Sequence, residues 1–519
     1  TGKASARVDT LRRQVEIRVP HSVWNPGTTK VRTTVGVGLW DVSAGRYLAP
    51  APGAATATTP GGGPGTAIVN VGPRTAEPQP FIVGATMADT AAGAAATTAF
   101  WRDRSQSMQL TRGDVTPFAS EVDFGKLRRH VHDDSGVPVT GPIDRLFASH
   151  YSYGQGLDPT RVCFDLASSF AAGAACKGSL VGQLQPYSLY VPAKKPAARG
   201  YGMTLLLHSL SANYNQYAAT HNQSQLGDRG TGSLVLTPAG RGPDGFYAGT
   251  PEADTFEAWA DVARHYRLDP SWTTVSGYSM GGFGTFRMLA RWPDLFSRGF
   301  SVVGAPGSVA DQLASLRNTP LLSWNSTEDE LVNISTTKAT IDSLTRAGVR
   351  FEEHLHLTAD HLTLAANDEY APGAAWLGQD TVDRNPFHVT FVVDPSEDAK
   401  AATVVADHAY WLSGLRGHGT VDAVSTGFGH GDAVLNPVID GAGVLTGGEI
   451  PALAYESESR TWGPLRSLLK SNSLLLKANG ITAVTIDAAR ARLTCDAVFW
   501  VRTNVPMKVT FCGKTRTYR

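Results

Sequence analysis

The chemistry that the sequence indicates most directly is that of a serine nucleophile. Residues 277–281 read Gly-Tyr-Ser-Met-Gly, a G-x-S-x-G pattern centred on Ser279. Residues 272–275 before it are β-branched and apolar, which predicts a short buried strand. Residues 283–292 after it have helical apolar spacing and stop at Pro293. A strand, a tight glycine-flanked turn and a helix would present the Ser279 hydroxyl at the edge of a sheet, as in a nucleophile elbow.

A base and an acid are expected further along the chain, in the order Ser, then Asp or Glu, then His. The predicted strand at 320–324 is followed by Asp329, which is the best acid. The two glutamates beside it are either near alternatives or solvated loop charges. The predicted strand at 351–357 is followed by His361, which is the best base. Each interval along the chain is long enough for a helix and a strand.

The roles of these residues follow from their chemistry. Serine is a weak nucleophile at neutral pH and needs a base within hydrogen-bond reach. His361 would take the proton of Ser279 and return it to the leaving group, while Asp329 would fix the imidazole tautomer and stabilise the imidazolium. A serine between glycines is often only a turn, so the interpretation depends on strand, helix, acid and histidine occurring in this order.

The negative charge that develops on the substrate oxygen needs two hydrogen-bond donors. One is expected to be the backbone N–H of Met280, at the start of the helix. The other should come from the loop after the apolar run at 203–207, where the backbone N–H of Ser209 or of Leu210 is favoured.

The elements around these residues predict an α/β fold. Apolar strand patterns alternate with helical patterns such as 256–266, which is typical of a mostly parallel sheet covered on both sides. The predicted strands of this part are 187–191, 203–207, 233–237, 272–275, 300–304, 320–324 and 351–357.

Both flanks of this core have β patterning, and three domains are predicted. A β-rich accessory domain over 1–145, expected to be sandwich-like, precedes an α/β catalytic domain over 146–375. A second β-rich domain follows over 376–519, with a clear strand at 388–393. The sequence does not decide whether the two β regions form one domain. The low-complexity segment 50–65 is expected to be a loop.

The bulk composition excludes two classes of protein. The 519 residues include 46 Lys and Arg against 46 Asp and Glu, so the formal net charge is zero. This balance argues against a protein that binds nucleic acid by neutralising phosphates. No apolar run approaches the roughly 20 residues needed to span a bilayer. The first residue is Thr1 rather than Met, which leaves open that a leader peptide was removed.

The four cysteines fall into two local pairs, Cys163 with Cys176 and Cys495 with Cys512. Neither pair is C-x-x-C and no histidine lies at zinc-finger spacing, so metal binding is not expected. Two loop-closing disulfides are the preferred interpretation, which implies an oxidising compartment. Four buried free thiols in a cytosolic protein are the alternative.

No metal or organic cofactor is expected. His354 and His356 lie on one face of a predicted strand, but without a clear third ligand a packing or surface role is favoured. Tyr247 either lines the substrate pocket or serves the turn in which it lies.

Several of these segments resemble the α/β-hydrolase superfamily. They are 187–192, 206–210, 268–270 and 277–282. Within the superfamily they most resemble secreted esterases of the polyhydroxybutyrate-depolymerase and feruloyl-esterase type, and they also resemble the catalytic domain of prolyl-oligopeptidase-like enzymes. The resemblance covers roughly 200 of the 519 residues and is specific for the superfamily rather than the substrate. Such esterases usually have His-Gly where this chain has His208 and Ser209, so the extra side chain would narrow the acyl pocket or add a donor.

The resemblance implies a secreted serine esterase that works through an acyl-enzyme, with polymeric or aryl esters as candidate substrates. A prolyl-oligopeptidase-like peptidase is a second hypothesis, disfavoured because the flanks show no regular propeller repeat. A third is a carbohydrate- or surface-binding protein with an inactive hydrolase core. The sequence gives no indication of the oligomeric state.

Overall fold

The computed structural model describes residues 3–38, 40–47, 68–72, 74–75, 116–133, 136–158, 179–210 and 212–519. The chain divides into two compact units. The first contains Thr1–Tyr201 and His208–Leu268, and the second contains Gly202–Leu207 and Asp269–Arg519. Each unit is described by itself.

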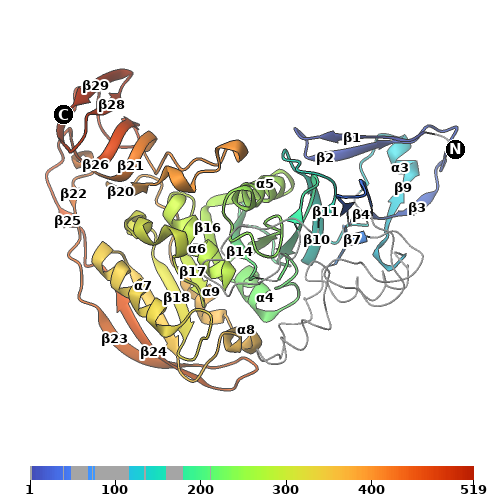
Figure 1. Cartoon of the computed structure of the whole chain (residues 1–519), viewed down its shortest axis with the longest axis horizontal. Coiled ribbons are helices and arrows are strands. Elements are labelled where there is room, and N and C mark those ends of the chain that lie inside the picture. The colour runs from blue at the N-terminus through green and yellow to red at the C-terminus, as the bar shows by residue number, and fades with distance from the viewer. Residues whose placement is uncertain are drawn as a thin grey trace. The chain divides into compact units, whose positions relative to one another are not determined.

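A mostly parallel sheet forms the centre of the second unit (Figure 1). Neighbouring strands from β16 to β19 are parallel, whereas β24 is antiparallel to β19 and β23 is antiparallel to β24. The predicted fold class, an α/β core with a mostly parallel sheet and β-rich flanks, is confirmed. In spatial order the strands are β14 (Tyr201–Leu207), β16 (Leu268–Tyr278), β17 (Gly299–Val302), β18 (Leu321–Ser326), β19 (Phe351–His356), β24 (Leu453–Arg460) and β23 (Ile439–Leu445).

The apolar runs become buried strands because helices pack against the sheet. Strands β17 and β18 are buried at every residue, as expected for parallel strands with both faces covered. Helix α6 (Met280–Arg291) packs against β17 and helix α7 (Ile334–Ala347) packs against β18, while η2 (Gly307–Asn318) packs against these two helices. Helix α7 shows how local sequence sets the ends: the Asn333 side chain caps its first turn, and Gly348 closes it with a φ of 69°. Two short helices follow β19, α8 (Thr363–Asn367) and α9 (Ala371–Leu377).

The first unit contains a four-stranded ladder and three α-helices among its described residues. All neighbouring strands of the ladder are antiparallel: β15 pairs with β13, β13 with β10, and β10 with β8. Both long strands, β10 and β13, are largely buried. In spatial order the strands are β15 (Ser233–Pro238), β13 (Leu184–Val191), β10 (Gly141–Ala148) and β8 (Arg74–Thr75), and the helices are α3 (Phe124–Arg128), α4 (His221–Asp228) and α5 (Thr250–His265).

The N-terminal region is β-rich, but its described residues do not form the expected sandwich. Apart from β8 and β10, its strands form separate two-stranded pairs, and large apolar side chains such as Leu11 and Ile17 are exposed rather than packed between two sheets. The alternation that predicted strands was correct, but it did not define a common buried face. The predicted loop at 50–65 lies outside the described residues. The pairs are β1 (Ser5–Asp9) with β2 (Gln14–Arg18), β3 (Lys30–Thr33) with β9 (Ser120–Asp123), β4 (Val35–Gly38) with β7 (Ile68–Gly72), and β5 (Trp40–Asp41) with β6 (Arg46–Tyr47).

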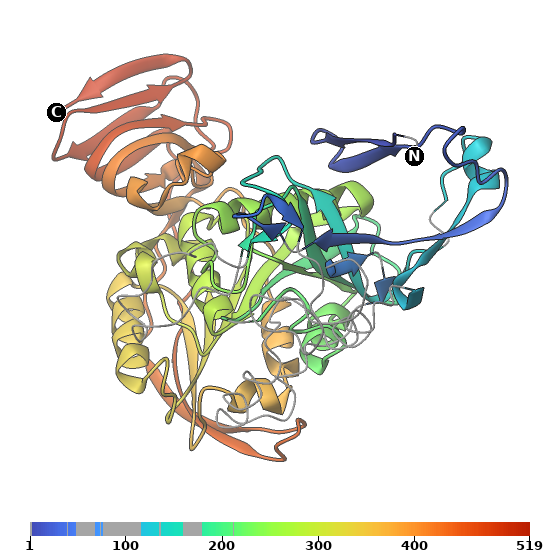
Figure 2. The same ribbon diagram turned by 45° about the vertical axis from the view of Figure 1, so that its right-hand side comes forward.

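The C-terminal region of the second unit contains a separate sheet (Figure 2). Its apolar residues alternate along the strands, and Val389, Phe391 and Leu474 are fully buried. Cys495 and Cys512 form a disulfide with a Cα–Cα distance of 5.7 Å, whereas Cys163 and Cys176 lie outside the described residues. The strands are β20 (His388–Val393), β21 (Leu412–Ser425), β26 (Ser473–Ile486), β27 (Val498–Thr503), β28 (Met507–Phe511) and β29 (Lys514–Tyr518).

The predicted domain boundaries do not coincide with the sheets. Strands β23 and β24 come from the region 376–519, yet they extend the central sheet beside β19. The boundary at 145 falls within β10. The two β-rich flanks lie mainly in different units, and the three-domain division stays a prediction. Among the described residues, no helix is both long and apolar enough to cross a membrane.

A carboxyl group lies buried inside the central sheet. Glu353, on β19, is 3% exposed, and its Oε1 accepts a hydrogen bond from Asn325 Nδ2 at 2.9 Å. Glu458 of β24 is its direct cross-strand partner. Burial raises the pKa of Glu353 to about 8, and the negative charge of Glu458 adds to this shift. Folding therefore stabilises the protonated form of Glu353 at neutral pH.

The buried acid predicts a pH-dependent loss of stability. Between the unfolded pKa of 4.5 and the folded value of about 8 the folded state holds the proton more tightly, so this group's contribution falls as pH rises. Glu353→Gln should remove that dependence. In melting curves from pH 5 to pH 9, the free energy of unfolding of the variant should therefore rise relative to that of wild type by on the order of a few kcal/mol. Glu456→Gln, an exposed change on the neighbouring strand β24, is the control. Parallel pH profiles for wild type and Glu353→Gln would contradict the prediction.

Candidate active site

Ser279 lies in a strained turn between β16 and α6. Its φ and ψ are 53° and −117°, a conformation that costs a non-glycine residue on the order of 1–3 kcal/mol. Two backbone hydrogen bonds hold the turn. The Ser279 N–H donates to Val302 O at 2.8 Å, and Ser279 O accepts from the Phe283 N–H at 3.0 Å. The local structure is the nucleophile elbow that the sequence predicts.

The glycines around Ser279 are required by close backbone contacts. A Cβ at Gly277 would lie 2.3 Å from Gly281 O, and a Cβ at Gly282 would lie 2.8 Å from the Cα of Gly304. Real Cβ atoms do not approach backbone atoms so closely, so a side chain at either position would push helix α6 away from the strands. The first glycine of the G-x-S-x-G pattern, and the glycine directly after the pattern, are therefore required by packing.

The structure brings Ser279, His361 and Asp329 together in one chain of hydrogen bonds. His361 Nε2 lies 2.9 Å from Ser279 Oγ. On the other side of the ring, His361 Nδ1 lies 2.8 Å from Asp329 Oδ2 and 2.9 Å from Oδ1. The three residues are 7%, 3% and 4% exposed, respectively. This geometry allows a proton to move from the hydroxyl to an imidazole that a buried carboxylate orients.

The Asp329 carboxylate is fixed by the loop that carries it. Its Oδ1 accepts the backbone N–H groups of Leu331 at 2.8 Å and Val332 at 2.7 Å. These two bonds are local, since both donors lie within three residues of Asp329. The turn after β18 therefore holds the carboxylate facing His361 without help from a distant side chain.

Two further side chains hold the backbone of His361. The Tyr278 hydroxyl donates to His361 O, and Glu330 Oε2 accepts the His361 N–H at 3.3 Å. Glu330 therefore contacts the site, although it is exposed, as Glu328 is. Sequence reasoning missed Tyr278, although a hydroxyl-bearing residue directly before the serine was a visible signal.

The predicted oxyanion donors differ in their surroundings. Met280 is the first residue of α6, so its N–H has no carbonyl partner inside the helix and lies at the positive end of the helix dipole. Ser209 and Leu210 lie in the first unit. The Ser209 N–H already donates to Gln216 Oε1 at 2.5 Å, and Leu210 is half-buried.

The segment around His208 is fixed by buried polar contacts. His208 is fully buried, and its Nδ1 and Nε2 each lie 3.0 Å from a carbonyl oxygen, those of Ser209 and Ala239. Burial lowers the pKa of His208. The Tyr247 hydroxyl donates to His208 O at 3.0 Å, and Tyr247 is 1% exposed. Tyr247 thus serves packing and the shape of this loop.

His354 and His356 pack within an aromatic cluster. The His354 ring stacks on Tyr455 with centroids 4.1 Å apart, and Trp324 lies 5.9 Å from His354 and 5.4 Å from His356. Burial lowers the pKa of His356 to about 3. Among the described residues no group of three or more His, Cys, Asp or Glu is arranged to hold a metal ion.

Comparison with known proteins finds distant structural neighbours. No family model and no curated protein matches the chain. A thermostable esterase is 19% identical with a TM-score of 0.34, and the match covers 38% of this chain and 60% of that one. A ferulic acid esterase is 16% identical with a TM-score of 0.33, and the match covers 38% of this chain and 93% of that one. Dipeptidyl peptidase 4 of Porphyromonas gingivalis is 17% identical with a TM-score of 0.31, and the match covers 39% of this chain and 34% of that one.

These neighbours include both esterases and a peptidase, so they do not distinguish between the two activities. The α/β-hydrolase fold of the core rests instead on its own features: the parallel sheet from β16 to β19, the elbow at Ser279, and the acid and histidine that follow later strands.

Proposed function

We propose that the protein is a serine hydrolase that cleaves carboxylic esters through an acyl-enzyme. The observation that carries the proposal is the hydrogen-bonded series Ser279, His361 and Asp329 on a strained elbow. A backbone conformation this costly persists only where the surrounding structure enforces it, and such strain clusters at functional sites.

In the proposed acylation, Ser279 Oγ attacks the ester carbonyl carbon while its proton passes to His361 Nε2. The tetrahedral intermediate collapses when the C–O bond to the alcohol breaks and His361 gives that proton to the departing alkoxide. In deacylation, water loses a proton to His361 and attacks the acyl carbon, and the proton then returns to Ser279 Oγ as the carboxylic acid leaves. Asp329 stabilises the imidazolium in both steps.

The developing oxyanion would accept the Met280 N–H, which the helix start leaves without a carbonyl partner. For the second donor we favour the Leu210 N–H over that of Ser209, because the Ser209 N–H is already donated to Gln216. The Ser209 side chain, in place of the usual glycine, is proposed to narrow the acyl site.

Polymeric or aryl esters are the proposed substrates, on the strength of the esterase resemblance. A prolyl-oligopeptidase-like activity is the second candidate, and it lacks the support of a propeller repeat in the sequence. An inactive core that serves carbohydrate or surface binding is the third, and the intact hydrogen-bonded series counts against it. The reaction as proposed uses no metal or organic cofactor.

Hydrolysis of p-nitrophenyl acyl esters, from acetate to laurate, tests this proposal. Wild type should turn over at least the members that fit its acyl site, and Ser279→Ala should lose about three or more orders of magnitude in kcat/KM. Asp329→Asn should also lose several orders of magnitude, because the imidazole would adopt the wrong tautomer. Ser413→Ala, an exposed change on β21, is the control and should equal wild type.

Three results would contradict the esterase proposal. Unchanged turnover in Ser279→Ala would remove Ser279 as nucleophile. Cleavage of peptide p-nitroanilides with no ester turnover would favour the peptidase. Inertness toward both would favour the binding protein.

We also propose that the protein works outside the reducing cytosol. The Cys495–Cys512 disulfide supports this, since such bonds persist in oxidising compartments. Mass spectrometry of unreduced protein should find this bond and, from the sequence, Cys163 linked to Cys176. The Cys495→Ala/Cys512→Ala variant should lose about 3 kcal/mol of stability in urea titrations, because the disulfide closes a loop with a sequence separation of 17. Four free thiols would overturn the proposal.

A further inference from the structure

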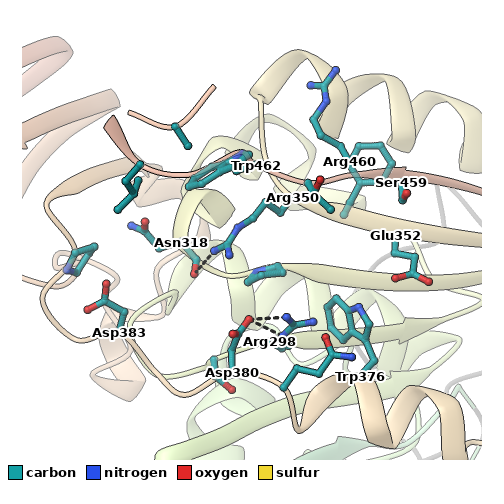
Figure 3. Close-up of a pocket in the computed structure, with 18 of the residues that line it drawn as sticks. Arg298, Asn318, Arg350, Glu352, Trp376, Asp380, Asp383, Ser459, Arg460 and Trp462 are labelled. Atoms are coloured by element: carbon teal, nitrogen blue, oxygen red, sulfur yellow. Dashed lines mark hydrogen bonds and ion pairs between the residues drawn. The ribbon is translucent and has the colours of Figure 1, made fainter. Parts of the chain in front are cut away.

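A cavity of 630 Å³ lies at the edge of the central sheet opposite to the serine site (Figure 3). Arg298, Asn318 and Arg350 line it, and they lie one, three and one residues before the starts of β17, β18 and β19, respectively. Asp329 and His361 instead follow β18 and β19. A six-residue strand rises about 3.3 Å per residue, so the two edges are separated by roughly 20 Å. The cavity is therefore distinct from the proposed catalytic site, and its exposed lining residues, such as Gln379 and Thr461, open it to solvent.

One arginine of the cavity is already neutralised. Arg298 forms an ion pair with Asp380, with Nη2 and Oδ2 2.6 Å apart, and its guanidinium lies 4.2 Å from the ring centroid of Trp376 (Figure 3). This pair and its aromatic neighbour make one fixed wall. The side chain of Arg298 is only 12% exposed, so it is held in place before any ligand arrives.

The second arginine has no such partner. The guanidinium of Arg350 lies 4.7 Å from the ring centroid of Trp462, and its Nη2 donates to Asn318 O at 3.2 Å. Its Nε is buried and has no hydrogen-bond partner among the residues that the structure describes. Within that same part of the chain it forms no ion pair with a carboxylate. Burial lowers the pKa of the Arg350 guanidinium, and the negative charge of Asp380 offsets this only in part, so a bound anion would further stabilise the charged form.

A third arginine and several carboxylates also line the cavity. Glu352 Oε1 contacts His354 Nε2 at 2.7 Å, and the Arg460 Nη1 donates to Thr345 O at 2.7 Å. Figure 3 shows the guanidinium of Arg460 directed away from the other arginines. Asp383 stays exposed on the lining. With Asp383 and the paired carboxylates nearby, a dianion such as phosphate would be repelled, whereas one carboxylate matches Arg350.

We propose that this cavity binds a carboxylate-bearing saccharide of the uronic-acid class. The guanidinium of Arg350 receives the carboxylate, the indoles of Trp376 and Trp462 contact the C–H faces of the sugar ring, and hydroxyl and amide side chains such as Gln379 and Thr461 bind its hydroxyl groups. The volume of 630 Å³ admits more than one sugar ring. This inference does not depend on ester hydrolysis at Ser279.

Binding to the full chain, measured by isothermal titration calorimetry, tests the inference. The probes are glucuronate and galacturonate, with glucose, benzoate and inorganic phosphate for comparison. A uronate should bind with one-to-one stoichiometry and at least tenfold more tightly than glucose. Arg350→Gln should weaken uronate binding at least tenfold, whereas Arg502→Gln, which removes an exposed arginine of β27, should not change it.

The alternatives separate clearly. Equal binding of glucose and uronates, or no binding of either, would overturn the proposal. Tighter binding of benzoate or of phosphate would overturn the ligand class. If Arg350→Gln melts at a lower temperature than wild type, Trp462→Ala and Arg350→Lys replace it. Both should weaken uronate binding, whereas the control Arg502→Gln should still bind uronate as wild type does. The titrations are repeated in Ser279→Ala, where unchanged uronate affinity is expected whether or not wild type hydrolyses esters.

Discussion

The close approach of helix α6 to strands β16 and β17 is the constraint on which the site depends. Glycines at 277, 282 and 304 let backbones meet where a Cβ would collide. That approach forces Ser279 to a positive φ and fixes its hydroxyl beside His361. The strain is offset by the burial of α6, whose residues are almost all inaccessible to solvent. The same packing that stabilises the core therefore orients the nucleophile.

The parallel strands give the second unit two edges with different chemistry. The acid and the histidine follow the carboxyl ends of β18 and β19, where loops can be fixed by short local bonds such as those from Leu331 and Val332 to Asp329. Polar residues with aromatic neighbours precede the amino ends. Because the rigid strands separate the two edges, loops at one edge can vary without disturbing the other.

Local sequence patterns predicted the individual helices and strands, but they did not predict which distant strands pair with one another. The run at 388–393 matches β20 because strict alternation reports a half-buried strand. The order of Ser279, Asp329 and His361 was readable because motif and strand ends are local features. Strand β24 was not, since its polar sequence joins β19 only through long-range pairing. The cavity was also invisible, because its arginines and tryptophans are scattered from 298 to 462.

Labelling with a fluorophosphonate, followed by peptide mass spectrometry, tests most directly whether Ser279 is an activated nucleophile. The account predicts stoichiometric, time-dependent modification of Ser279, much slower in His361→Gln because the hydroxyl then has no base within reach. Buried serines without a base, such as Ser276 and Ser301, should stay unmodified. Absence of labelling in correctly folded wild type, or an equal rate in His361→Gln, would contradict it.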